Sequence, residues 1–194
     1  MDFNYLRSRI VFWVQWTLSV IVGFSLSPLF AIFLALLIGP FQNDTYLTNL
    51  LSISLANGIL IGFLNWLILR NELQQSGRWV LWCVIGFVVA SYLTHSKEMG
   101  DLSTSVRALI FGACLGISQS WGINMRIGKD WGWLIAANIL GWMIGEIIGQ
   151  FVGESIGKFW YFPIVGFVVG ITTGYAMIRI LHDISAKSSQ ATVE

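Results

Sequence analysis

The stretch Gly58–Arg70, GILIGFLNWLILR, decides the fold of this chain. It is apolar apart from Asn65 and the closing Arg70, and Gly58 and Gly62 form a Gly-x-x-x-Gly pair. Inside a membrane, lipid tails leave little hydrophobic drive between helices, and such a glycine pair lets a neighbouring backbone approach closely. The stretch therefore predicts a membrane helix that packs against another helix through its glycine face.

The same pattern returns twice in the sequence, each time after 54 residues (112 − 58 and 166 − 112). Both glycines and the polar position of the first stretch have counterparts at this offset. The equivalent sets are Gly58, Gly112 and Gly166; Gly62, Gly116 and Gly170; and Asn65, Gln119 and Thr173. A pattern that repeats at a fixed period predicts a structural unit used several times.

The helices that precede these stretches also resemble one another. Their shared positions are Trp16, Gly23 and Ser27; Trp79, Gly86 and Ala90; and Trp133, Gly141 and Gly145, where the third set has one inserted residue. The unit is therefore a two-helix hairpin, and two helices per unit give every copy the same orientation. The sequence predicts an all-α, polytopic membrane protein with six transmembrane helices, arranged as three parallel two-helix repeats in a pseudo-threefold bundle.

Composition supports a membrane protein. Of the 194 residues, 56% are hydrophobic and only 11% are charged, with a mean hydropathy of +0.72. Soluble domains carry about 25% charged residues, so most of this surface is expected to face lipid. The net charge of +1 gives no reason to expect a nucleic-acid partner.

A helix needs about 20 apolar residues to cross a bilayer, and six apolar runs in the sequence qualify. They cover 10–38, 48–69, 78–94, 104–125, 131–151 and 160–181. We expect Gly39-Pro40 to end the first run and Pro28 to kink it. Residues 1–181 form a single predicted bundle, and the polar segment 182–194 is predicted to be a disordered cytoplasmic tail.

The distribution of Lys and Arg predicts the orientation, because cytoplasmic loops are enriched in positive charge. Eight of these residues fall on the side of the N-terminus and three on the other side, which places both termini in the cytoplasm. The first group is Arg7, Arg9, Arg70, Arg78, Arg126, Lys129, Arg179 and Lys187, and the second is Lys97, Arg107 and Lys158.

The equivalent residues Asn65, Gln119 and Thr173 are the first candidate site. Each follows the second glycine of its pair by three residues, so it shares the glycine face and points into the bundle. Two interpretations stay open: hydrogen bonds between helices that fix the packing, or a polar notch for a ligand. Asn138 is a further inward candidate.

Glu146 is the one carboxylate well inside an apolar run, in ILGWMIGEIIGQF. Ionisable residues in a membrane are costly and usually have a partner or a function. Arg107 is predicted at a similar depth and is the expected partner. The alternatives are a structural ion pair, or a proton relay or ligand anchor.

Eight of the ten tryptophans fall in the predicted cytoplasmic half of the bundle, while Trp142 is predicted to be central and Trp160 to lie on the far side. Trp66 stands among them, directly after Asn65. An interfacial anchoring belt is the simpler explanation. The alternative is an aromatic-walled site for a pigment, a quinone or a lipid, so a lipid or a pigment is the expected class of bound cofactor.

The segment G-x-x-x-G-x-x-N/Q-W, followed by L-R, resembles a motif of a group of uncharacterised multispanning membrane proteins, which are mainly cyanobacterial. In that group, the motif G-x-x-x-G-x-x-Q-W-x-x-L-R recurs two or three times. The first copy matches at Gly58, Gly62, Trp66, Leu69 and Arg70, with Asn65 in place of Gln. The second keeps the glycines and Gln119 but has Ser120 and Asn124 for Trp and Arg, and the third keeps only the glycines. The resemblance covers roughly 55–150 and implies a bacterial plasma or thylakoid membrane.

The sequence contains no recognisable catalytic constellation and no room for a soluble domain. We therefore expect a non-enzymatic integral membrane protein, an accessory, assembly or scaffold subunit that packs against other membrane proteins and membrane lipid. The alternative function is small-molecule binding or transport, with a polar site inside the bundle around Glu146 and Arg107.

Overall fold

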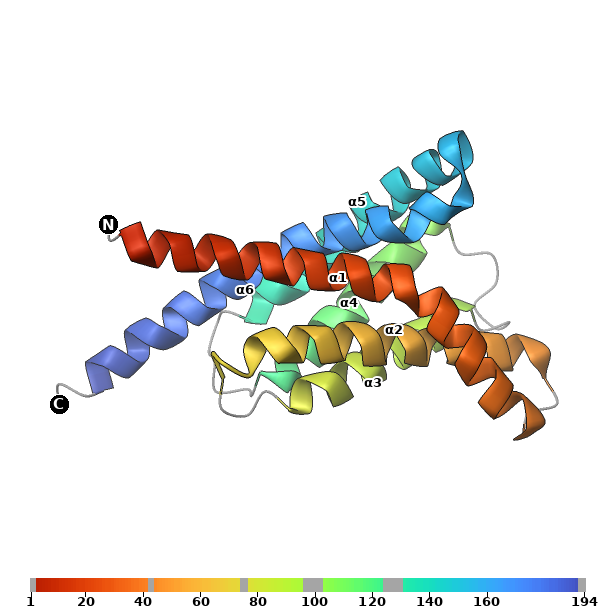
Figure 1. The fold of residues 1–194 in the computed structure, drawn as a ribbon, viewed down its shortest axis with the longest axis horizontal. Coiled ribbons are helices and arrows are strands. Elements are labelled where there is room, and N and C mark those ends of the chain that lie inside the picture. The colour runs from red at the N-terminus through yellow and green to blue at the C-terminus, as the bar shows by residue number, and fades with distance from the viewer. Residues whose placement is uncertain (1–2, 42–43, 74–76, 96–102, 124–130, 192–194) are drawn as a thin grey trace.

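The computed structural model describes residues 3–41, 44–73, 77–95, 103–123 and 131–191, and every regular element in these ranges is helical (Figure 1). All six predicted apolar runs coincide with helices. The elements are α1 (Phe3–Ile38), α2 (Thr45–Leu69), α3 (Arg78–His95), α4 (Thr104–Gly122), α5 (Trp131–Ile156) and α6 (Tyr161–Ala191), with 3₁₀ turns at Gly39–Phe41 (η1) and Lys158–Trp160 (η4).

Local sequence explains where α1 ends and where α2 begins. Gly39 and Pro40 end α1 at Ile38, as expected, because proline cannot continue the hydrogen-bond ladder. Asp44 caps α2: its carboxylate accepts hydrogen bonds from the backbone N–H groups of Tyr46 and Leu47, at 2.9 and 3.3 Å.

Five of the described helices are long and apolar enough to cross a membrane. They are the segments Arg7–Ile38, Thr45–Leu69, Arg78–His95, Trp131–Ile156 and Lys158–Ile184. The helix α4 is not among them, because its 19 residues include Arg107, Gln119 and several serines and glycines. Five apolar helices of this length are consistent with a membrane protein.

The six helices form a ring in chain order. Each helix packs on the helices before and after it in the sequence, and α6 closes the ring by packing on α1. The beginning of α1 and the end of α6 lie at the same end of the molecule, at the left of Figure 1.

The glycine pairs lie where the backbones of neighbouring helices touch. A Cβ atom added at Gly58 would lie 2.6 Å from the Cα atom of Val84, and one added at Gly116 would lie 2.5 Å from the Cα atom of Ile135. These distances leave no space for a side chain, so α2 packs on α3, and α4 on α5, through direct backbone contact. The full set of facing pairs is Gly58 and Val84, Gly62 and Val80, Gly112 and Ile139, Gly116 and Ile135, Gly166 and Ile21, and Gly170 and Thr17.

One predicted correspondence is wrong. Trp16 and Trp79 are buried, with 1% and 0% of their surface exposed, but Trp133 is 46% exposed. The fully buried residue on α5 is its neighbour Leu134. Trp133 instead lies under the guanidinium of Arg179, whose Cζ is 4.1 Å from the ring centroid.

The helix α1 continues through Pro28 and bends along its length (Figure 1). Proline has no N–H to offer the carbonyl one turn earlier. The hydroxyl of Ser27 donates to that carbonyl, on Phe24, at 3.0 Å, which replaces the missing hydrogen bond.

The predicted disordered tail differs from the structure, in which α6 continues to Ala191. No glycine or proline follows Gly174 to stop the helix, and Ala, Lys and Gln in this segment are good helix formers. The segment is polar, as expected, but it is helical as far as Ala191.

Candidate functional site

The predicted polar residues Asn65, Gln119 and Thr173 do meet near the middle of the ring. All three are buried, and each bonds to a side chain of a different helix. The bonds are from Ser19 Oγ to Asn65 Oδ1 (2.5 Å), from Asn138 Nδ2 to Gln119 Oε1 (3.0 Å) and from Trp16 Nε1 to Thr173 Oγ1 (3.0 Å). We name these six residues the axial polar layer.

The axial polar layer is closely packed. The space lined by five of its members, all except Ser19, measures about 10 Å³, which is about the smallest volume that admits one water molecule. The interhelical hydrogen bonds expected by the first interpretation are therefore present at Asn65, Gln119 and Thr173, and Asn138 lies inward as predicted. Ligand binding at this layer stays a prediction.

Trp66 lies outside this layer. It is half-buried on α2, next to the ring of Phe63 at a centroid distance of 5.5 Å. The Cζ of Arg70 is 5.8 Å from the Trp66 ring centroid. A tryptophan that stacks with a terminal arginine suits an anchoring role at a membrane surface.

A larger cavity of about 240 Å³ lies on the same axis, at the end of the ring away from the termini. We name it the axial cavity. Its lining includes the aromatic residues Phe24, Phe111 and Trp142, and the Trp142 ring contacts those of Phe24 and Phe111 at centroid distances of 5.6 and 4.7 Å. All six helices contribute to its lining, which includes Asn57, Ser91, His95, Thr104, Arg107, Trp142, Glu146, Gln150 and Tyr161.

Arg107 and Glu146 both line the axial cavity, but the predicted ion pair between them is wrong. No ion pair joins them within 4 Å in the described ranges. Glu146 instead accepts hydrogen bonds from the Tyr161 hydroxyl, at 2.5 Å, and from the Gln150 side-chain amide, at 3.1 Å. The reason is local: Gln150 is one turn along α5, and Tyr161 begins α6, which packs back on α5.

Three residues that line the cavity each hold a buried polar atom with no hydrogen-bond partner in the described part of the chain: Asn57 Oδ1, Arg107 Nε and Trp142 Nε1. A buried polar group left unsatisfied costs about 1–3 kcal/mol. Only six such side-chain atoms occur among the described residues, and half of them belong to residues that line this one cavity. Proteins keep such costly groups mainly where they have a function.

Sequence analysis found Arg107 and Glu146 but missed the other polar residues of the cavity. Asn57 directly precedes Gly58, yet nothing in its immediate sequence separates it from a packing residue. Gln150 lies one helical turn after Glu146 on α5, whereas Tyr161 reaches Glu146 only because the α5–α6 turn brings α6 back against α5. No group of His, Cys, Asp and Glu in the described ranges is suited to hold a metal ion.

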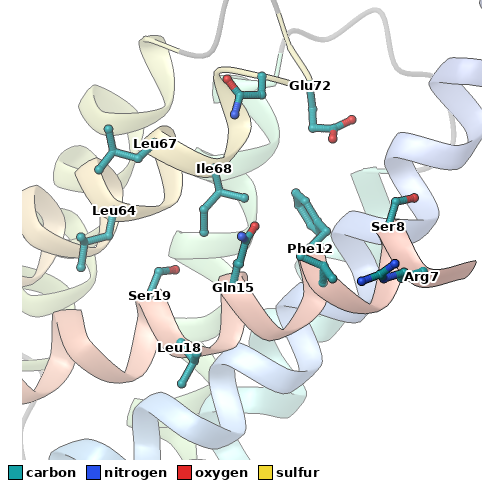
Figure 2. Close-up of a pocket in the computed structure, with 12 residues that line it drawn as sticks. Arg7, Ser8, Phe12, Gln15, Leu18, Ser19, Leu64, Leu67, Ile68 and Glu72 are labelled. Carbon is teal, nitrogen blue, oxygen red and sulfur yellow. The ribbon is translucent and has the colours of Figure 1, made fainter. Parts of the chain in front are cut away.

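A second hollow, the lateral groove, lies between α1 and α2 and measures about 740 Å³ (Figure 2). It shares no lining residue with the axial cavity. Its lining consists of Arg7, Ser8, Val11, Phe12, Gln15, Leu18 and Ser19 on one side, and Leu64, Leu67, Ile68, Asn71 and Glu72 on the other.

These features define an all-helical protein with five helices able to span a membrane and a polar cavity within the helix ring. No family model, curated protein or solved structure matches the chain.

Proposed function

We propose that this chain is a non-enzymatic integral membrane protein that binds a small polar molecule carrying an anionic group in the axial cavity. The observation that carries the proposal is that three residues lining one cavity, Asn57, Arg107 and Trp142, each hold a buried polar atom without a hydrogen-bond partner in the described part of the chain. A ligand that supplies their missing partners would remove the cost of burying them.

The donors and acceptors of the cavity indicate what such a ligand carries. Arg107 and the Trp142 indole N–H can only donate hydrogen bonds, which suits a carboxylate or phosphate group. Asn57 Oδ1 and the Glu146 carboxylate accept, which suits an ammonium or a hydroxyl group. A volume of about 240 Å³ lies just below the range of about 300–1,000 Å³ typical of ligand pockets, so the molecule is small.

We further infer that the chain is built from three copies of one two-helix unit. Support comes from the glycines of the odd-numbered helices: Gly23 faces Ile61, Gly86 faces Leu115 and Gly141 faces Val169. The three facing residues are spaced by 54 positions, as are the glycine pairs. The aromatic rings of Phe24, Phe87 and Trp142, at matching positions of the three units, contact one another pairwise.

The proposed repeat allows the polar residues of the axial cavity to be compared with the residues at the same positions of the other units. At these positions the residue types differ between units. Packing around a threefold axis favours similar side chains in each copy. Divergence at positions that face the cavity therefore favours a chemical role for these residues. The equivalent sets are Ile53, Arg107 and Tyr161; Asn57, Phe111 and Val165; and Pro28, Ser91 and Glu146.

We also propose that α4 spans the membrane, which gives six spans with both termini in the cytoplasm. Gly86 faces Ser118 while Gly122 faces Trp79, so α4 runs antiparallel to α3 along its length. It therefore crosses the same thickness as α3. A bacterial plasma or thylakoid membrane is the proposed location, on the resemblance described above.

A reporter at each terminus tests this topology in intact cells. We expect a membrane-impermeant reagent to label neither terminus, because an even number of spans returns the chain to the cytoplasm. Labelling of one terminus alone would require an odd number of spans, and labelling of both would reverse the orientation.

The Asn57→Leu variant tests the binding site through opposite effects on stability and binding. Leucine fills a similar volume without the unpartnered carbonyl, so we expect the free energy of unfolding to rise by about 1 kcal/mol. Binding should weaken by about tenfold, equivalent to one lost hydrogen bond of about 1.4 kcal/mol. The probes are a panel of small amino acids, dicarboxylates and inorganic phosphate, and the measurement is ligand-induced thermal stabilisation.

The matched control is Ser52→Ala on the same helix. Ser52 Oγ is also buried without a partner in the described ranges, but it lies outside the cavity lining. We expect this variant to gain stability while every probe binds as in the unaltered protein. Equal binding by both variants and the unaltered protein would contradict the proposed site.

An accessory role is the second candidate function, and the end of α1 favours it. Beyond Pro28, this helix exposes Leu29, Ile32, Phe33, Leu36 and Leu37. At about 1.5 Å of rise per residue, its 36 residues exceed the length needed for one bilayer crossing. Another membrane protein or lipid would cover this surface, and co-purification of a stoichiometric partner from the native membrane tests the former.

A further inference from the structure

The lateral groove between α1 and α2 has a polar end and an apolar end. Because the two helices are antiparallel, the start of α1 lies beside the end of α2. Arg7 and Ser8 on one wall thus meet Asn71 and Glu72 on the other. Figure 2 shows Arg7, Ser8 and Glu72 at one end of the groove and Leu18, Leu64 and Leu67 at the other.

The outer surface around the groove is the kind that faces lipid. Along α1, the residues Val11, Val14, Leu18 and Val22 are all exposed and apolar. The groove interrupts this apolar surface, and its polar end coincides with the charged start of the helix. Charged side chains at this position mark the boundary between a bilayer and water.

The charges at the polar end are complementary to a head group and are not neutralised by each other. Arg7 and Glu72 are both exposed, and no ion pair joins them in the described ranges. A guanidinium binds phosphate through parallel hydrogen bonds. A carboxylate accepts hydrogen bonds from hydroxyl or ammonium groups.

We propose that the lateral groove binds one glycerolipid of the surrounding membrane, whose head group carries both an anionic group and hydrogen-bond donors. Arg7 receives the anionic group, and Glu72 and Asn71 accept from the donors. An acyl chain lies along Leu18, Leu64 and Leu67. The volume of about 740 Å³ falls within the range of about 300–1,000 Å³ for ligand sites. This site is independent of the axial cavity.

Native mass spectrometry of the full chain tests this proposal. The protein is reconstituted in vesicles with equal amounts of phosphatidylglycerol, phosphatidylethanolamine and phosphatidylcholine, and the lipids retained after gentle extraction are counted. We expect one retained lipid, drawn from the first two, because phosphatidylcholine has a phosphate but no N–H or O–H donor. Retention of phosphatidylcholine at the same level would overturn the head-group assignment.

Two matched tryptophan variants test the acyl part of the groove. Leu18→Trp fills the groove from a side chain that is 54% exposed, and Leu140→Trp adds the same ring on α5 at a residue that is 55% exposed. Since both positions lie on the surface, both variants should fold. We expect only Leu18→Trp to lose the retained lipid, and equal lipid retention by the two variants would overturn the site.

Two charge variants test the head-group contacts. Arg7→Gln should weaken retention of both preferred lipids by about tenfold, the loss of one charge-assisted hydrogen bond. Glu72→Gln should instead reduce the preference for these lipids over phosphatidylcholine. If neither substitution changes the lipid profile, Arg7 and Glu72 do not bind the head group. Thermal stabilisation by the small polar probes should be unchanged in both variants, which separates this groove from the axial cavity.

Discussion

Replacing Gly116 by leucine is expected to prevent the assembly of the helix ring. The Cβ atom alone would lie 2.5 Å from the Cα atom of Ile135 and 3.2 Å from its Cβ and Cγ1 atoms. Because the first of these contacts is with the backbone, no side-chain rotation relieves it. Overpacking costs about 1–3 kcal/mol where a core can adjust, and we expect a loss at or above the upper end of that range.

The measurement is the fraction of monodisperse protein after extraction, together with its unfolding by a denaturing detergent. Gly132→Leu on α5 is the matched control, because nothing lies within 4 Å of a Cβ atom at that position. We expect the control to fold as the unaltered protein does. A Gly116→Leu variant that is equally stable would show that α4 and α5 do not pack through this glycine.

Replacing Arg107 by methionine is expected to weaken the binding of anionic probes by one to two orders of magnitude without loss of stability. A hydrogen bond to a charged group contributes about 1.5–3 kcal/mol, so the affinity should fall by about 10- to 100-fold. The fold should not weaken, because Arg107 has no ion-pair partner in the described ranges and its buried Nε lacks a hydrogen bond there. Isothermal titration with the strongest-binding anion of the probe panel measures the effect.

Gln119→Leu should give the opposite result and is the control. Gln119 belongs to the axial polar layer, where Asn138 donates to it at 3.0 Å, and it does not line the axial cavity. Losing an interhelical hydrogen bond in a membrane costs about 0.6–2 kcal/mol. We expect lower stability with unchanged probe affinity. Normal binding by Arg107→Met would contradict the role of this residue as the anion anchor.

The sequence predicted the helices well because glycine spacing, apolar length and proline are local signals. Gly39-Pro40 ends α1 where expected, and the six apolar runs match the six helices to within a few residues at most ends. The start of α1 and the continuation of α6 to Ala191 were the exceptions. Polar composition alone does not decide whether a terminal segment is helical.

The candidate site was only partly predictable, because its contacts depend on the packing of helices distant in the sequence. An apolar run drew attention to Glu146, and a similar depth drew attention to Arg107, and both do line one cavity. Depth does not give distance, however, so the expected ion pair was wrong. Similarly, the period of the repeat indicated that Asn65, Gln119 and Thr173 face inward, but not that their side chains leave a space of only about 10 Å³.

The most direct test of the proposed function is native mass spectrometry of the protein released gently from its own membrane, with the Arg107→Met variant prepared in parallel. We expect the unaltered protein to carry a small, polar, non-lipid molecule that is released on unfolding and absent from the variant. The same molecule retained by the variant, or no such molecule on either protein, would contradict binding in the axial cavity.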